Sequence, residues 1–170
     1  MINFKKYLGI FFAIIFSLLI FIFRDELSYF KQFGYFGLFI LNTLGSATLA
    51  IPTPLFLTAV AAGSVLNPFL VTIVSSLGSA IGELTGYYVG YKAVDILEKD
   101  KNVQIVKKWM DKYGLVALFF LSAVPNPIFD AAGIFAGATK IPIYKYLIIV
   151  WLGKMVKFAT LAFTGYIVVN

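Results

Sequence analysis

The stretch AVPNPIFDAAGIFAG, residues 123–137, places helix-breaking and polar residues inside one of the most apolar parts of this chain. Pro125 and Pro127 each remove an amide donor and exclude helical geometry from the residue before them. The apolar arms on either side, residues 114–124 and 128–137, are each shorter than the roughly 20 helical residues that cross a bilayer. We therefore predict a re-entrant helical hairpin, with a kinked full-length helix as the alternative.

A related stretch, IPTPLFLTAVAAG, occurs at residues 51–63. Both copies contain Pro-x-Pro, an aliphatic residue, Phe and a closing Ala-Gly, and each precedes a long apolar segment, residues 67–91 and 146–169. One span then separates two hairpins, so the hairpins enter the membrane from opposite faces. This pattern predicts an inverted repeat, an architecture typical of transporters. For the first copy, a full span formed by residues 35–51 stays open.

The composition indicates an integral membrane protein. The 170 residues are 61% hydrophobic and only 13% charged, and no formal charge occurs between Lys31 and Glu83. Soluble domains carry about 25% charged residues. An apolar run at residues 7–23, behind two lysines, resembles a signal sequence, but no small-x-small cleavage site follows it, so we expect an uncleaved span.

The lysines predict the orientation of the chain in the membrane. With three spans, two hairpins and the N-terminus inside, the outer side receives only Arg24 and Lys31. The inner side receives Lys5, Lys6, Lys92, Lys99, Lys101, Lys107, Lys108, Lys112, Lys140 and Lys145. This bias follows the positive-inside rule and favours the cell membrane with the N-terminus in the cytoplasm. We assign the net charge of +6 to lipid head groups rather than to nucleic acid.

The chain has no cysteine and no histidine. Disulfides, zinc sites of the usual ligand types and histidine acid–base chemistry are therefore excluded. We see no nucleophile–base pair and no metal-ligand pattern, and we predict a protein that is not an enzyme and uses no cofactor or metal.

Four ionisable residues interrupt the apolar segments: Glu83, Asp130, Lys154 and Lys157. Glu83 and the two lysines fall near the middle of their predicted spans, and Asp130 follows the break of the second hairpin. Unpaired charge is costly at that depth, so we expect the four to converge. Glu83 and Asp130 are candidates for a proton or charge relay, and a static ion-pair cluster is the alternative.

Two capping residues stand directly before prolines, in Thr53-Pro54 and Asn126-Pro127. This is the signature of a helix start, with free amides and the positive end of the helix dipole pointing into the protein. Together with Lys154 and Lys157, these starts are candidates for binding an anion such as a lipid phosphate. The alternative is that the caps only satisfy amides at the breaks.

The predicted span at residues 67–91 has two distinct faces. One is a polar stripe formed by Thr72, Ser75, Ser79, Glu83 and Tyr87. The other carries a glycine at every fourth position, namely Gly78, Gly82, Gly86 and Gly90. Small residues at this spacing let a second helix approach closely, so we assign the glycines to helix packing.

The motifs PNPIFDAAGIFAG, Gly153-Lys154 and IGELTGYYVGY resemble the DedA/VTT (SNARE-associated) membrane family, in particular its vacuole membrane protein branch. The resemblance covers roughly residues 35–166. It implies movement of lipids between leaflets, with functional weight on Glu83, Asp130, Asn126, Pro127 and Lys154. Bacterial relatives carry arginines around the second hairpin, whereas this chain has only Arg24, which argues against undecaprenyl phosphate as the specific lipid.

We therefore expect an all-α integral membrane protein built as an inverted repeat of two re-entrant hairpins, each followed by a long span. An N-terminal transmembrane and interfacial helix (residues 1–34) precedes the membrane domain (35–170), whose repeats are residues 35–91 and 103–169. The predicted function is a lipid translocase or scramblase for anionic phospholipid or polyprenyl phosphate. A proton-coupled transporter with Glu83 as carrier, or a structural membrane protein, is the alternative. A homo-oligomer stays open.

Overall fold

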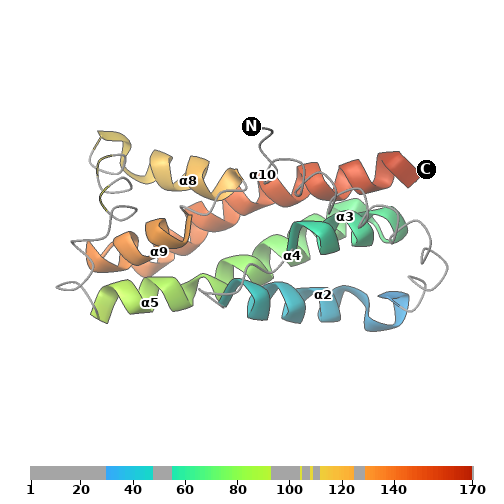
Figure 1. Ribbon diagram of the computed structural model, residues 1–170, viewed down its shortest axis with the longest axis horizontal. Helices are drawn as coiled ribbons and strands as arrows, with labels where there is room; N and C mark the ends of the chain where they lie inside the picture. Colours follow the sequence, from blue (N-terminus) through green and yellow to red (C-terminus); the bar gives the residue numbers. More distant parts are fainter. Residues whose placement is uncertain are drawn as a thin grey trace, which may run out of the picture.

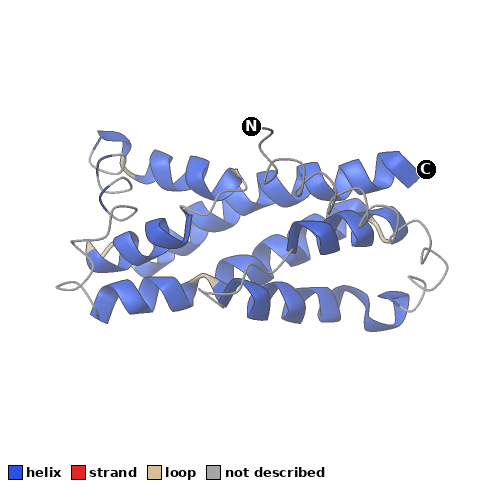
Figure 2. Ribbon diagram, in the orientation of Figure 1, coloured by secondary structure: helices blue, strands red, loops and turns tan. Residues whose placement is uncertain are grey.

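The computed structural model describes residues 30–47, 55–92, 104, 108, 112–124 and 129–169. The predicted first span at residues 7–23 lies outside the described residues, as do both Pro-x-Pro breaks with Thr53, Pro54, Asn126 and Pro127. The described residues form helices and a few turns beside them, without a β-strand, as Figure 2 shows.

Seven helices form the described structure (Figure 1). They are α2 (Phe30–Ala47), α3 (Leu55–Val65), α4 (Pro68–Gly82), α5 (Leu84–Lys92), α8 (Leu115–Ala123), α9 (Phe129–Ala138) and α10 (Ile143–Val169). Helices α2, α3, α8 and α9 occupy the sequence positions of the predicted hairpin arms. Helices α4 and α5 together occupy the position of the second predicted span, and α10 that of the third.

Among the described residues, two segments are long and apolar enough to cross a membrane, Pro68–Lys92 with 25 residues and Ile143–Val169 with 27. The first consists of α4 and α5, which are separated only by a turn at Glu83. It begins at Asn67, whose side chain accepts hydrogen bonds from the amides of Phe69 and Leu70 at 3.0 and 3.3 Å. With Pro68 at the first helical position, this is a well-capped helix start.

The two long segments pack against each other in antiparallel orientation. Contacts along their length pair residues near the start of one segment with residues near the end of the other. They are Val71 with Ala162 in one core cluster, a hydrogen bond between Ser79 and Lys154, and the rings of Tyr87 and Tyr146 at 5.0 Å. This antiparallel pair forms the centre of the molecule (Figure 1).

Helix α2 runs parallel to α4 and very close to it. A Cβ atom added to Gly78 would meet the backbone of Phe39, and one added to Gly82 would meet the backbone of Thr43. In the other half of the chain, α8 packs on α10 in the same manner, because a Cβ at Gly153 would meet Ser122 and the backbone of α8. Glycine therefore sets the spacing of both helix pairs.

The remaining short helices, α3 and α9, pack across the halves of the chain. Helix α3 lies against α10, with Gly63 against Ala162 and Gly165 against Val60. Helix α9 lies against α5, and there too each helix contributes one glycine to the contact. Gly90 faces the backbone of Ile134, and Gly137 faces the backbone of Tyr87.

Candidate functional site

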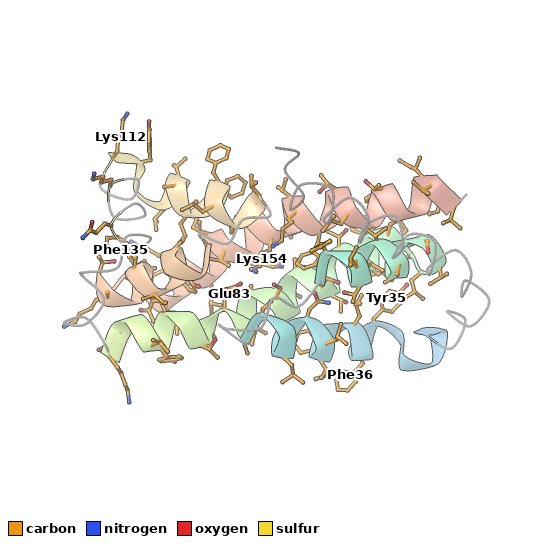
Figure 3. All side chains as sticks on the ribbon, viewed as in Figure 1. Tyr35, Phe36, Glu83, Lys112, Phe135 and Lys154 are labelled. Atoms are coloured by element: carbon orange, nitrogen blue, oxygen red, sulfur yellow. The ribbon has the colours of Figure 1, made fainter. Side chains whose placement is uncertain are left out.

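Glu83 and Lys154 form an ion pair inside the protein. The Lys154 Nζ lies 2.9 Å from Glu83 Oε1, and the two residues are only 2% and 6% exposed. Figure 3 shows the two side chains directed toward each other in the middle of the molecule, between the two long segments. A charged pair removed from water in this way costs free energy that its mutual attraction only partly returns.

The ion pair lies near half-depth of both candidate spans. Glu83 is about 13 Å along the helix from Lys92, at a rise of 1.5 Å per residue. Lys154 is about 17 Å from Ile143 by the same measure. A charge at this position in a spanning segment is expensive and marks a functional pathway by default.

Serine hydroxyls extend the ion pair toward α2. Lys154 Nζ donates a second hydrogen bond to Ser79 Oγ at 2.7 Å, and Ser79 Oγ lies 2.6 Å from Ser46 Oγ. The result is a continuous polar chain from Glu83, in the turn between α4 and α5, through Lys154 of α10 and Ser79 of α4 to Ser46 of α2.

Aromatic residues flank the polar chain. The Tyr146 hydroxyl is fully buried and donates to the backbone carbonyl of Glu83 at 3.3 Å. Its ring packs on Tyr87, whose hydroxyl donates to the carbonyl of Ile141 at 2.6 Å. The Trp151 Nε1 donates to Ser76 Oγ at 3.1 Å. These bonds fix the position of the Glu83 backbone and tie α10 to α4.

The polar stripe predicted on residues 67–91 is buried. Its five members are Thr72, Ser75, Ser79, Glu83 and Tyr87, which are 0 to 6% exposed. Large apolar side chains of the same segments, including Phe69, Ile81 and Leu152, are exposed instead. A polar interior with an apolar exterior is the arrangement that a hydrocarbon environment favours.

The structure brings together two of the four predicted ionisable residues, Glu83 and Lys154. Lys157 is half-buried on α10, with its Nζ 5.5 Å from the centre of the Phe158 ring. Asp130 belongs to α9, but its side chain lies outside the described residues. Among the predicted packing glycines, Gly78 and Gly82 contact α2, Gly90 contacts α9, and Gly86 is buried.

Sequence reasoning missed one contributor to the site, Ser46 on α2. Asn42 lies four residues earlier on the same helix, the spacing that places side chains on one face. Polar residues at this spacing in an apolar arm were the available signal. Their significance depends on the contact with α4, which local sequence does not encode.

The described residues contain no group of three or more His, Cys, Asp or Glu side chains that could hold a metal ion. On the surface of α8, a pocket of about 520 Å³ combines cationic and apolar walls. Its lining residues are Lys108, Lys112, Tyr113, Val116, Ala117 and Phe120. This composition suits an amphipathic molecule with an anionic head group.

Comparison with known proteins identifies the protein family that this chain matches. The model of the VTT domain matches residues 51–167. The uncharacterized membrane protein YbfM of Bacillus subtilis is 30% identical over 128 residues, which cover 68% of this chain and 78% of YbfM.

Two further relatives carry more specific names. Vacuole membrane protein KMS2 of Arabidopsis thaliana is 28% identical over 124 residues, 61% of this chain but only 30% of the plant protein. An alkaline phosphatase-like protein of Lactococcus lactis is 29% identical over 143 residues, 74% of this chain and 66% of that protein. No solved structure gives a significant match.

Proposed function

The chain belongs to the VTT domain family of membrane proteins, and from this premise we propose that it moves lipid head groups between the two leaflets. The lipids are anionic phospholipids or polyprenyl phosphates. The observation that carries the proposal is the polar chain that runs from the buried residues Glu83, Lys154 and Ser79 to half-buried Ser46, at half-depth of the candidate spans. Moving a charged head group through hydrocarbon is costly, and a polar groove lowers that cost.

The proposed architecture contains two re-entrant hairpins. In support of the first, the Tyr35 hydroxyl near the start of α2 accepts a hydrogen bond from the Asn67 amide just after α3, at 3.3 Å. In support of the second, Gly114 before α8 and Thr139 after α9 line one pocket. In each case the first arm starts where the second arm ends, as expected of a chain that returns to its own side.

The inverted repeat, residues 35–91 and 103–169, is supported by glycine contacts at equivalent positions. Gly78 and Gly153 each receive the first arm of their own hairpin, and Gly90 and Gly165 each receive the second arm of the other. Both pairs have the separation of 75 positions that also relates Ser79 to Lys154. Gly34 and Gly114, at the starts of the first arms, share a positive φ of 53° and 57°. We propose a pseudo-twofold axis at the Ser79–Lys154 contact.

Lysine side chains are the groups that we propose to bind the phosphate of the lipid head group. We propose that a phosphate is first held at the Lys108 and Lys112 pocket and then received by Lys154, Lys157 and the predicted helix starts. Those starts are Thr53-Pro54 and Asn126-Pro127. Glu83 and Asp130 hold the lysines or exchange protons with them. We place the protein in the cell membrane with its N-terminus inside and assign it no enzymatic step.

Reconstitution into liposomes with a leaflet-labelled phospholipid tests this function. We expect the protein to accelerate exchange of the label between leaflets, for anionic lipids first. Absence of acceleration for every phospholipid and for a polyprenyl phosphate would contradict the proposal. Protein-free liposomes and liposomes with an unrelated helical membrane protein are the controls.

The second candidate is a proton-coupled transporter of a small solute, which the buried carboxylate of Glu83 favours. The same liposomes distinguish it, because a proton leak or solute uptake without lipid exchange would support this candidate. Phosphatase activity toward lipid phosphates, suggested by the name of the Lactococcus relative alone, is a further outcome that would replace the transport proposal.

A further inference from the structure

Asn42 on α2 and Ser75 on α4 are both fully buried, and each has a polar atom without a hydrogen-bond partner among the described residues. The Asn42 amide nitrogen donates to the carbonyl of Leu38 at 2.8 Å, but its Oδ1 has no partner, nor does Ser75 Oγ. Buried polar groups are almost always paired, either with protein atoms or with internal water. Two such fully buried atoms are therefore candidates for binding an internal water molecule.

The register of α2 against α4 places Asn42 and Ser75 at the same level along the two helices, a level that we call a layer. The hydroxyls of Ser46 and Ser79 are 2.6 Å apart, and they are separated by 33 positions in the sequence. Asn42 and Ser75 have the same separation and lie one helical turn earlier on the same two helices. Because α2 and α4 run parallel and in close contact, this register places the two residues at the same level of the helix pair, and both are fully buried.

The layer of Asn42 and Ser75 lies between two other layers along the helix axes. On one side lies the polar layer of Ser46, Ser79 and Lys154, described above. One turn away on the other side lies a core cluster of apolar residues, Leu38, Ala62, Val71 and Ala162. By the antiparallel register in which Ser79 meets Lys154, the residue of α10 at the level of Ser75 is Phe158, which is 1% exposed.

We propose that Asn42 Oδ1 and Ser75 Oγ bind an internal water molecule, one helical turn from Ser79 and Lys154. Water fits because both groups are uncharged and both lack partners. A metal ion is disfavoured because the Lys154 ammonium lies in the next layer, and a lipid group is excluded by complete burial. The water extends the polar chain beyond Ser79 toward the end of the molecule at which α4 begins.

The proposed water has no counterpart in the second repeat. Across the central pair of segments, the position equivalent to Ser75 is Val150, which is also fully buried and packs in the core cluster of Tyr87 and Tyr146. The water therefore lies on the Asn42 side of Lys154 and not on the tyrosine side. The site goes beyond the proposed transport function, because the water does not depend on lipid movement.

A thiol in place of the Ser75 hydroxyl tests the site directly. The chain has no cysteine, so Ser75→Cys introduces a single S–H group with its own infrared band, at nearly unchanged volume. We expect this band to be lost rapidly, by conversion to S–D, when the reconstituted protein is transferred to D₂O. The matched control is Val150→Cys, at the equivalent buried position, whose band we expect to persist.

Persistence of the Ser75→Cys band, or equally fast loss of both bands, would overturn the proposal. A second variant tests the water site without a thiol, in case the thiol perturbs the site. Ser75→Ala removes one partner of the water and is expected to lower the thermal midpoint of unfolding, whereas a higher midpoint would show that the hydroxyl is buried dry. Neither readout uses lipid transport, so the water site and the proposed function can fail separately.

Discussion

At the scale of the residue, the Glu83–Lys154 pair places two charges in the described interior, where the other buried side chains are apolar or uncharged. A carboxylate and an ammonium 2.9 Å apart, both almost inaccessible, are retained where apolar residues of similar size would pack without desolvating any charge. Ser79 accepts a further hydrogen bond from Lys154, and Ser46 in turn pairs with Ser79. The pair is therefore stable once formed, and sensitive to the loss of either partner.

We predict that Lys154→Met destabilises the protein by about 3–5 kcal/mol, because it leaves the Glu83 carboxylate buried without its counter-charge. The double variant Lys154→Met with Glu83→Leu should recover much of this loss. Denaturant unfolding in detergent measures both values. Lys145→Met, at an exposed lysine of the same helix, is the control and should change little. Equal stability of Lys154→Met and Lys145→Met would contradict the interpretation.

The sequence was sufficient to predict that Glu83 and Lys154 meet, because both lie near the middle of predicted spans and unpaired charge is costly there. It was not sufficient to find Ser46, since this residue joins the site only through the tight packing of α2 on α4. The participation of Asp130 stays a prediction, because its side chain lies outside the described residues.

At the scale of the element, glycine determines which helices touch. The four glycines of residues 78–90 suggested one packing face, yet Gly78 and Gly82 contact α2 whereas Gly90 contacts α9. Residues four apart advance around a helix by slightly more than one turn, so Gly90 is rotated by about 120° from Gly78. The turn at Glu83 lies between the two faces. Because the glycines rotate around the helix axis in this way, they contact two different helices, α2 and α9.

We predict that Gly90→Leu separates α5 from α9 and lowers stability by about 1–3 kcal/mol, the usual cost of overpacking. A side chain at this position would collide with the backbone of Ile134, which cannot move aside as a flexible side chain can. Val89→Leu, at the neighbouring position that is 42% exposed, is the matched control. The thermal midpoint in detergent measures the difference, and an unchanged midpoint for Gly90→Leu would refute the packing argument.

At the scale of the whole molecule, the proposal of two opposed hairpins predicts which surface positions share a side of the membrane. Lys112 precedes α8 and Lys140 follows α9, so both should face one compartment. Asn67, between α3 and α4, should face the other. All three are exposed, and the chain has no cysteine, so single cysteines at these positions can be labelled with an impermeant reagent.

We expect Lys112→Cys and Lys140→Cys to be labelled from the same side of sealed proteoliposomes, and Asn67→Cys from the opposite side. Labelling after the membrane is opened with detergent controls for total reactivity. If Lys112→Cys and Lys140→Cys were labelled from opposite sides, α8 and α9 would together form a full span, and the second hairpin would be wrong.

The sequence predicted the large-scale features that depend on local chemistry. The second and third predicted spans coincide with the two candidate spans of the described residues, Pro68–Lys92 and Ile143–Val169. The sequence could not predict that α3 packs on α10 and α9 on α5. These contacts are between residues far apart in the sequence, and they depend on how closely the backbone of one helix fits against a glycine of the other. The hairpins themselves stay predictions, since their tips lie outside the described residues.

The central claim is that lipid head groups cross the membrane through the polar chain around Lys154. The most direct test compares lipid exchange between leaflets in liposomes that contain the wild-type protein, Lys154→Met or Lys145→Met, at equal amounts of folded protein. We predict that Lys154→Met abolishes the acceleration while Lys145→Met retains it. Full exchange activity in a folded Lys154→Met variant would contradict the account.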